Sequence, residues 1–282
     1  MHNEQPSLCW LMSLSIENQF AMCGRYLLVQ KAEVIERAFN IVIPPSIGYR
    51  PAYNISAGQP ALVVTSEAPR QAQSFVFGLT PFWAKKPMYL INARAEGDHN
   101  KSNERDYSGD KGIIHKPAFR KAIRSQRCLV LADAFIEGTT REKLNKPYLI
   151  YLKGRKPFAM AGIWDRWVHP ESNDEMFSFA IITVPANELL DQLPHHRSPV
   201  ILEKGMEDAW LRGSSLQDVT WMLKPYPGEK MNGYPISNKI RPPGADGKEL
   251  IVPVGERLQP EETIQSAEEL KLLGMGRYRP NR

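Results

Sequence analysis

The order of its apolar segments is the feature that most constrains the fold of this chain. Short apolar runs of strand type follow one another without a helical segment between each pair, which excludes the regular alternation of a parallel α/β sheet. Helical spacing of apolar residues is confined to residues 32–39, 186–193 and 206–223. We therefore predict an α+β fold with mostly antiparallel strands in one domain. The strands are expected at residues 26–29, 61–65, 74–79, 128–136, 148–152, 158–163 and 177–184, the last of them central.

Two segments are expected to be loops. Residues 44–59 are rich in Pro and Gly, which interrupt both helices and strands. Residues 98–111 (DHNKSNERDYSGDK) are polar and lack periodicity, so they are predicted to form a surface loop or insertion. Loops of this length are often functional, but a mobile connection is the favoured interpretation here.

The two ends of the chain differ from its body. Residues 1–21 contain no Lys or Arg and no continuous apolar stretch, so they lack the features of a signal peptide. They are expected to be a disordered or removed leader, or an extension ahead of a true start at Met22. Residues 256–282 are expected to form a C-terminal helix and tail, because Ser266 and Glu269 make a capping box and Gly274 can end the helix.

Composition narrows the class of protein, its cellular location and the kind of partner it binds. The 282 residues are 42% hydrophobic and contain no run of 18 apolar residues, so neither a disordered chain nor a membrane span is expected. Three cysteines are too few for a disulfide framework, which favours the cytoplasm. Residues 1–21 hold two of the 31 acids, so the remaining chain has 36 basic against 29 acidic residues. This excess favours a polyanionic partner, although a soluble protein that is merely basic has the same composition.

Several common catalytic patterns are absent from the sequence. It has no P-loop, no G-x-S-x-G, no H-E-x-x-H and no C-x-x-C motif. Its six histidines have no partner at metal-ligand spacing. We therefore expect neither a metal site nor a small-molecule cofactor.

The segment Met22–Cys23 carries an unusual chemical possibility. If translation starts at Met22 and this methionine is removed, Cys23 becomes the first residue. Its α-amine (pKa about 7.7–8.0) and its thiol (pKa about 8.5) would then both be partly nucleophilic near neutral pH. Such an aminothiol can form a Schiff base with an aldehyde and close a thiazolidine ring. The alternative is a small buried residue at the start of a strand.

Three further segments carry groups suited to catalysis. Asn92 offers donors and an acceptor, and Arg94 offers a planar fork for phosphate, although both could simply end a strand. Glu137 ends an apolar strand, where burial would raise its pKa toward that of a general acid or base. His195 and His196 precede an apolar strand, and adjacent residues of a strand face opposite sides.

A basic stretch precedes the strand expected at 128–136. Residues 111–127 contain no acid, and the aromatic pair Phe82–Trp83 could supply a stacking surface beside it. This combination suits single-stranded nucleic acid, although a solvated helix face explains the charges equally well. The basic residues are Lys111, Lys116, Arg120, Lys121, Arg124 and Arg127.

Taken in order, these segments resemble the SRAP family, the SOS-response-associated peptidases, which are also described as abasic-site processing proteins. Each piece is common, but their order from residue 22 to about residue 254 is specific. The matching pieces are MCGRY (22–26), YNISAG (53–58), FGLTPFWA (77–84), INARAE (91–96), CLVLADAFIEG (128–138), HHRSPVIL (195–202) and PIS (235–237).

The resemblance implies a catalytic domain over residues 22–255 that encloses a groove for single-stranded DNA. Cys23 would join the aldehyde of an abasic site as a thiazolidine, after removal of the residues that precede it. Asn92 would position the sugar or the amine, and Glu137 and His195 would transfer protons. The implied DNA-binding residues are Arg25, Arg94, Trp83 and Arg197.

The implied protein belongs to the DNA damage response and works as a cytoplasmic monomer, nucleoid-associated in a bacterium, without a membrane partner. Two other functions fit the same residues. A cysteine-dependent autopeptidase or amidohydrolase would use Cys23, Glu137 and His195 on a peptide or amide instead of DNA. A non-catalytic single-strand binder would use the basic stretch and Trp83, and its affinity would be salt-sensitive but indifferent to the lesion.

Overall fold

The computed structural model describes residues 24–261. The expected leader, the expected nucleophile Cys23 and the helix expected around residues 266–274 lie outside this range. No helix within it is long and apolar enough to cross a membrane.

The strands are β1 (Arg25–Leu28), β2 (Ala52–Ser56), β3 (Pro60–Thr65), β4 (Ala72–Phe77), β5 (Asn92–Arg94), β6 (Arg127–Ala132), β7 (Ala134–Thr139), β8 (Lys143–Leu152), β9 (Phe158–Val168), β10 (Glu175–Pro185), β11 (Arg197–Pro199) and β12 (Met231–Pro235). The helices are α1 (Ala32–Phe39), α2 (Ala122–Ser125), α3 (Glu188–Asp191), α4 (Glu207–Arg212) and α5 (Leu216–Thr220), with single 3₁₀ turns at Pro45–Ile47, Gly112–Ile114, Gly228–Lys230, Asn238–Ile240 and Lys248–Ile251.

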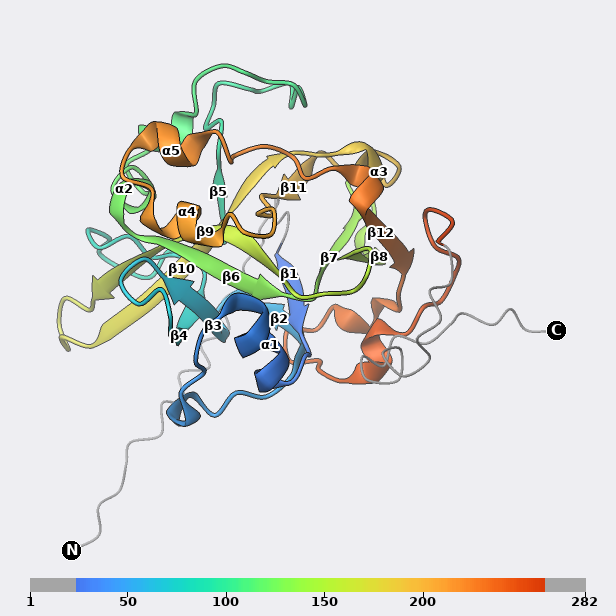
Figure 1. Cartoon of the computed structure of the whole chain (residues 1–282), viewed down its shortest axis with the longest axis horizontal. Coiled ribbons are helices and arrows are strands. Elements are labelled where there is room, and N and C mark those ends of the chain that lie inside the picture. Colours follow the sequence, from blue (N-terminus) through green and yellow to red (C-terminus); the bar gives the residue numbers. More distant parts are fainter. Residues whose placement is uncertain (1–23, 262–282) are drawn as a thin grey trace, which may run out of the picture.

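The strands form two sheets (Figure 1). One has the order β12-β8-β7-β1-β2, and all its neighbours are antiparallel. The second runs β11-β10-β4-β3-β6-β9, and β10 also pairs with β9, so five of its strands close into a small barrel. Only the pairings of β10 with β4 and β5 are parallel. The expected α+β fold with mostly antiparallel strands is confirmed.

Long β10 is the central strand, as its apolar sequence predicts. Its first half pairs with β9 and β4, and its second half lies between β5 and β11. The large hydrophobic core fills the barrel, with Phe77 and Phe179 stacked at 5.2 Å between ring centroids. A smaller core cluster, which includes Leu27, Ile136 and Tyr234, lies on the other face of the five-stranded sheet. The predicted helix at residues 32–39 coincides with α1.

Three sequence predictions are corrected by the structure. The expected loop 44–59 contains β2, whose alternating residues pair with β1 despite the nearby prolines. The single strand expected at 128–136 is two strands, because the chain crosses from the barrel to the other sheet at Asp133. The helix expected at 206–223 divides into α4 and α5 at Gly213, and Ser215 begins α5 with a capping box to Asp218.

Asp133 explains why the chain turns where it does. Its carboxylate accepts hydrogen bonds from the backbone N–H groups of Val29 (2.6 Å) and Gln30 (3.0 Å), just after β1. Its own N–H donates to the carbonyl of Leu27 (2.8 Å). Burial outweighs the two backbone hydrogen bonds and raises the pKa of this carboxyl to about 6. The crossing thereby fixes the start of β7 against β1.

Candidate active site

Glu137 and His195 meet in the interior. Glu137 lies near the end of β7, and its Oε2 is 3.3 Å from Nε2 of His195; the side chains are 5% and 7% exposed. Nδ1 of His195 lies 3.0 Å from the carbonyl oxygen of Gly138. Because a carbonyl can only accept, Nδ1 carries a hydrogen and Nε2 is directed at the carboxylate. A hydrogen bond between Nε2 and Glu137 then requires one further proton, so the pair is built to hold and move a proton.

The neighbouring His196 takes a different position. Its side chain is exposed, and its Nδ1 lies 3.3 Å from Oγ1 of Thr140. Partial burial, followed by the charges of His195, Arg197 and Arg94, lowers the pKa of His196. Strand alternation predicts opposite orientations for the two histidines, but both precede β11 and their rings stack nearly parallel, with 6.0 Å between centroids. The buried position beside Glu137 belongs to His195.

The start of the described chain leads to this pair. Tyr26 pairs with Phe135, and Leu27 with Ala134, in the antiparallel contact of β1 with β7. Continued by two residues, the same register sets Gly24 opposite Glu137. Cys23 lies outside the described residues, but it is bonded directly to Gly24.

Asn92 and Arg94 lie on β5, beside the second half of β10. Asn92 is aligned with Ile181, and its side-chain amide donates to the carbonyl of Ile91 (3.2 Å). Arg94 is aligned with Thr183, and its Nη2 donates to the carbonyl of Asn100 (2.7 Å). Burial, then the charge of Arg197, lowers the pKa of Arg94. Both side chains are half-buried, so each retains a face toward solvent.

Arg197 is placed differently from its expected role at the DNA. Its side chain is fully buried, and its two terminal nitrogens donate to the two carboxylate oxygens of Glu96 (2.7 and 2.9 Å). Nη2 also donates to the carbonyl of Thr183 (2.8 Å). Burial opposes ionisation of Glu96, but the hydrogen bonds and charge of Arg197 outweigh it and lower the pKa of Glu96. In this structure Arg197 braces β5, β10 and β11 from within and presents no surface to a ligand.

Arg25 joins β1 to a distant part of the chain. Its Nη1 donates to Oδ1 of Asn54 and to the carbonyl of Ile240, both at 2.8 Å, and its Nη2 donates to the carbonyl of Arg241 (2.5 Å). Desolvation lowers the pKa of this half-buried guanidinium. Most of its donors are therefore engaged within the protein.

Phe82 and Trp83 form an exposed aromatic pair beside the basic stretch. Their side chains are 53% and 48% exposed, and the ammonium of Lys121 lies 4.5 Å from the ring centroid of Phe82. Buried groups hold the backbone beneath them. The carboxylate of Asp165 accepts from the N–H of Phe82 (2.9 Å), and the indole of Trp167 donates to the carbonyl of Ala84 (2.7 Å). The two rings project outward because their backbone is fixed from below.

The remaining basic residues do not all join this surface. Arg127 is buried, and its guanidinium donates to backbone carbonyls that include those of Trp210 (2.6 Å) and Gly213 (2.7 Å). Lys116 pairs with Asp98. Arg127 of the basic stretch is therefore not part of an exposed basic surface. Within residues 24–261, no group of His, Cys, Asp or Glu side chains is arranged to hold a metal ion.

Sequence reasoning missed two residues that organise this region. Glu96 stands in the INARAE segment, where only its buried contact with Arg197 identifies its role. Asn103 lies in the polar segment 98–111, and its Oδ1 accepts hydrogen bonds from Arg94 (2.6 Å) and Arg197 (3.3 Å). No periodicity or motif in that segment could have indicated this contact.

Comparisons with known proteins agree with the order of these segments. A family model described as SOS response associated peptidase (SRAP) matches residues 22–243. The chain is 33% identical over 238 residues to abasic site processing protein YoqW of Bacillus subtilis, a match that covers 82% of this chain and 99% of YoqW. It is 28% identical over 261 residues to abasic site processing protein HMCES of Gallus gallus, covering 80% of this chain and 73% of HMCES.

The fold is shared with a solved structure. A protein of Bacteroides thetaiotaomicron matches with a TM-score of 0.66 and 29% sequence identity. That match covers 79% of this chain and 97% of the bacterial protein. The two-sheet arrangement described above is therefore also known from crystallography.

Proposed function

This chain belongs to the SOS response associated peptidase (SRAP) family, and from that membership we propose that it captures abasic sites in single-stranded DNA through Cys23. The relatives named abasic site processing proteins support the lesion as the target. The observation that supports the proposal is the register of β1 with β7, which, continued by two residues, would bring Gly24 opposite Glu137 of the buried Glu137–His195 pair.

The proposed reaction needs an aminothiol and a proton carrier. The deoxyribose of an abasic site opens to an aldehyde, and the α-amine of Cys23 condenses with it to an imine and one water molecule. The thiol then adds to the imine carbon, and its proton passes to the nitrogen, which closes a thiazolidine. Overall, the adduct equals protein plus DNA minus one water molecule.

Glu137 and His195 move the protons in these steps. Ring opening delivers a proton to the ring oxygen of the sugar, and imine formation requires protonation of the departing hydroxyl. A carboxyl and an imidazole that share one proton can give it in one step and recover it in the next. Asn92 binds the sugar or the amine from the neighbouring strand β5.

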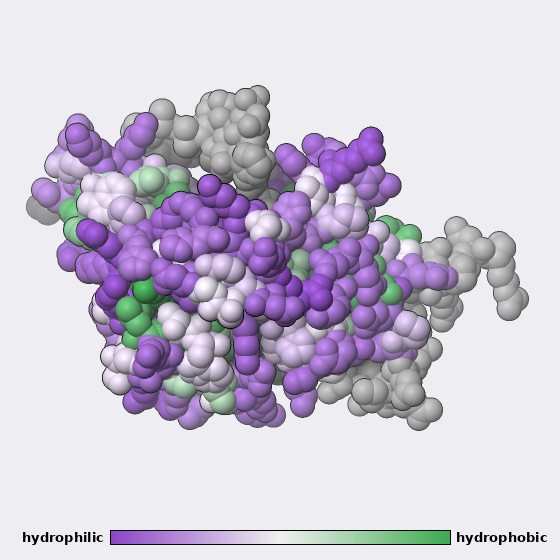
Figure 2. Space-filling model, turned by 90° about the horizontal axis from the view of Figure 1, so that it is seen from above, coloured by the Kyte–Doolittle hydropathy of each residue, from purple (hydrophilic) through white to green (hydrophobic). Residues whose placement is uncertain are grey.

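The proposed DNA contacts use groups that retain a face toward solvent. Arg94 and Arg25 bind phosphates next to the lesion, and Trp83 stacks on an unpaired base. Arg197 is fully buried, shares the Asn103 acceptor with Arg94 and takes no direct part in binding. Seen from the side of residues 98–111, the molecular surface is mainly hydrophilic with scattered apolar residues, which suits a polar partner (Figure 2).

The residues ahead of Cys23 must be absent for this reaction, because a peptide bond would occupy the α-amine. We infer that the protein removes them itself, or that translation starts at Met22 and this methionine is then removed. In the first case Cys23, Glu137 and His195 also form a peptidase centre for a single internal cut.

Intact mass spectrometry tests the proposal. The purified full chain is weighed before and after incubation with a single-stranded oligonucleotide that carries one abasic site. We expect a species that starts at Cys23 and gains the oligonucleotide mass less one water. Cys23→Ala should form no adduct. Cys128→Ala is the matched control, because Cys128 is fully buried in β6 and burial raises the pKa of its thiol.

Three other outcomes would contradict the proposal. An adduct that persists in Cys23→Ala overturns the proposed nucleophile. Tight binding that is indifferent to the abasic site and to Cys23 indicates a non-catalytic single-strand binder. Cleavage of protein substrates without any effect of abasic DNA indicates a peptidase.

A further inference from the structure

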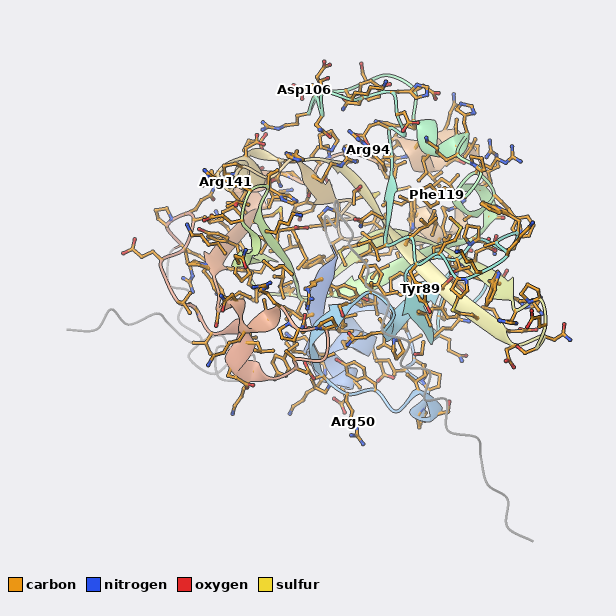
Figure 3. The ribbon with its side chains drawn as sticks, turned by 180° about the vertical axis from the view of Figure 1, so that it is seen from behind. Arg50, Tyr89, Arg94, Asp106, Phe119 and Arg141 are labelled. Carbon is orange, nitrogen blue, oxygen red and sulfur yellow. The ribbon has the colours of Figure 1, made fainter. Side chains whose placement is uncertain are left out.

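The polar segment 98–111 is anchored to the protein at two places. It arches above β5 at the top of the molecule, and Asp106 marks its far end above Arg94 (Figures 1 and 3). Nε of Arg105 donates to the carbonyl of Ala186 (3.1 Å), and its terminal nitrogens pair with Glu188 and Asp191 of α3. The favoured interpretation of this segment as a mobile connection does not account for these bonds.

The second anchor is Asn103. Its backbone is in the left-handed region with φ 59°, which asparagine tolerates better than most residues. This conformation directs Oδ1 toward two guanidinium groups at once, Nη2 of Arg94 at 2.6 Å and Nη1 of Arg197 at 3.3 Å. A neutral acceptor between two cations is stabilised by both charges.

The two arginines differ in which guanidinium nitrogens remain available to a ligand. Arg197 is fully buried and is bonded to Glu96 and Thr183 through both terminal nitrogens. Arg94 is half-buried and donates only through Nη2, to Asn100 and Asn103. Nε of Arg94 is buried and has no hydrogen-bond partner within the described residues. Asn103 and Asn100 therefore hold Nη2 of this half-buried side chain, and Nη1 is the terminal nitrogen left to donate to a ligand.

We propose that Asn103 is a positioning residue that orients Arg94 toward a phosphate of the bound DNA. This inference rests on the proposed function and adds residues 98–111 to the DNA-binding region. Without the Asn103 contact, Arg94 keeps a single hydrogen bond to a carbonyl and can rotate about its side chain. Binding then has to order the guanidinium, and the affinity falls.

Binding of single-stranded DNA by full-chain variants tests the role. The probe is an oligonucleotide with a tetrahydrofuran at the lesion, which has no aldehyde and so reports binding alone. Asn103→Gly removes the amide without strain at φ 59°, and we expect roughly tenfold weaker binding, as for loss of one hydrogen bond to a charged group. Asn103→Asp keeps an acceptor at the same place and should stay within about threefold of wild type. Ser102→Gly adds the same flexibility one residue away and should bind as wild type.

A double-mutant cycle separates positioning from general loop damage. In the Arg94→Ala background, Asn103→Gly should have no further effect on affinity. Arg94→Ala should also lower the slope of log Kd against log salt concentration by about 0.7, the value for one lost phosphate contact on a single strand, whereas Asn103→Gly should leave the slope unchanged because Arg94 still reaches the phosphate. Thermal unfolding of Asn103→Gly should remain a single transition.

Two results overturn the inference in distinguishable ways. If Arg94→Ala weakens binding but Asn103→Gly does not, or if their effects are additive, Asn103 does not act through Arg94 and the proposed function is untouched. If wild type itself does not bind the oligonucleotide, the proposed function fails and the role of Asn103 fails with it.

Discussion

Glu137 and the imidazole of His195 are held by one strand end. Glu137 supplies the carboxylate 3.3 Å from Nε2, and the next residue, Gly138, supplies the carbonyl that lies 3.0 Å from Nδ1. The same two residues of β7 therefore fix both nitrogens of the ring. This arrangement sets which nitrogen faces the carboxylate before any substrate binds.

Glu137→Gln should slow adduct formation roughly 100-fold, within the usual range for loss of a general acid or base. The amide keeps the size of the side chain but cannot transfer a proton. Binding of the tetrahydrofuran oligonucleotide should be unchanged, which separates chemistry from affinity. The rate is measured as the appearance of the covalent species on a denaturing gel.

His195→Gln should reduce the same rate to a similar extent, and combining it with Glu137→Gln should cost little more because the two residues act as a unit. His196→Gln is the matched control, since its exposed ring contacts Thr140 and does not face Glu137. Equal impairment of His195→Gln and His196→Gln would contradict the assignment of His195.

Arg197→Ala should destabilise the fold. The substitution leaves the Glu96 carboxylate buried without its partner, and loss of one member of a buried pair costs about 3–5 kcal/mol of unfolding free energy. Urea denaturation measures this loss. Arg166→Ala is the control, because the Arg166–Glu175 pair is exposed and its loss should leave stability nearly unchanged. A stable Arg197→Ala protein that has lost only DNA affinity would restore Arg197 to the binding surface.

The sequence motifs indicated the candidate side chains of the site, but not the residues that contact and orient them. Strand alternation predicts opposite sides for His195 and His196, but both precede β11, and the position of the His195 ring depends on the carbonyl of Gly138 in β7. Arg94 and Arg197 looked equivalent as phosphate ligands. The two differ because Arg197 is buried in an ion pair with Glu96, whereas Arg94 is half-buried and partly exposed to solvent.

The order of apolar segments was enough to predict the fold class. The strand boundaries could not be predicted in this way, because they depend on tertiary contacts. Residues 128–136 are apolar apart from Asp133, so their periodicity does not indicate that the chain changes sheet there. The change is fixed by the N–H groups of Val29 and Gln30, which are distant in sequence. For the same reason, the burial of Arg127 could not be read from a basic stretch, because its acceptors are the carbonyls at the end of α4.

Trp83→Ala should weaken binding of single-stranded DNA without affecting stability. Stacking of one base on an aromatic ring is worth about 1–3 kcal/mol, which corresponds to a loss of roughly 5- to 150-fold in affinity. Trp221→Ala is the matched control, because Trp221 is 53% exposed, like Phe82, but follows α5 and contacts Lys224 instead of the basic stretch. Fluorescence anisotropy of a labelled oligonucleotide measures both. Equal losses in the two variants would show that the effect is not specific to the aromatic pair.

Asp133 should make the stability of the protein fall as pH rises from about 4 to about 6. Its pKa is about 6 in the folded protein and about 3.9 in the unfolded chain, so in this window the folded state binds more protons. The free energy of unfolding then decreases with pH, by about 3 kcal/mol in total for this group. Asp133→Asn cannot titrate, so the stability of wild type minus that of the variant isolates the effect. Urea denaturation should give a difference that drops by that amount between pH 4 and pH 7, and a constant difference would mean that the two N–H groups of Val29 and Gln30 fully compensate the buried charge.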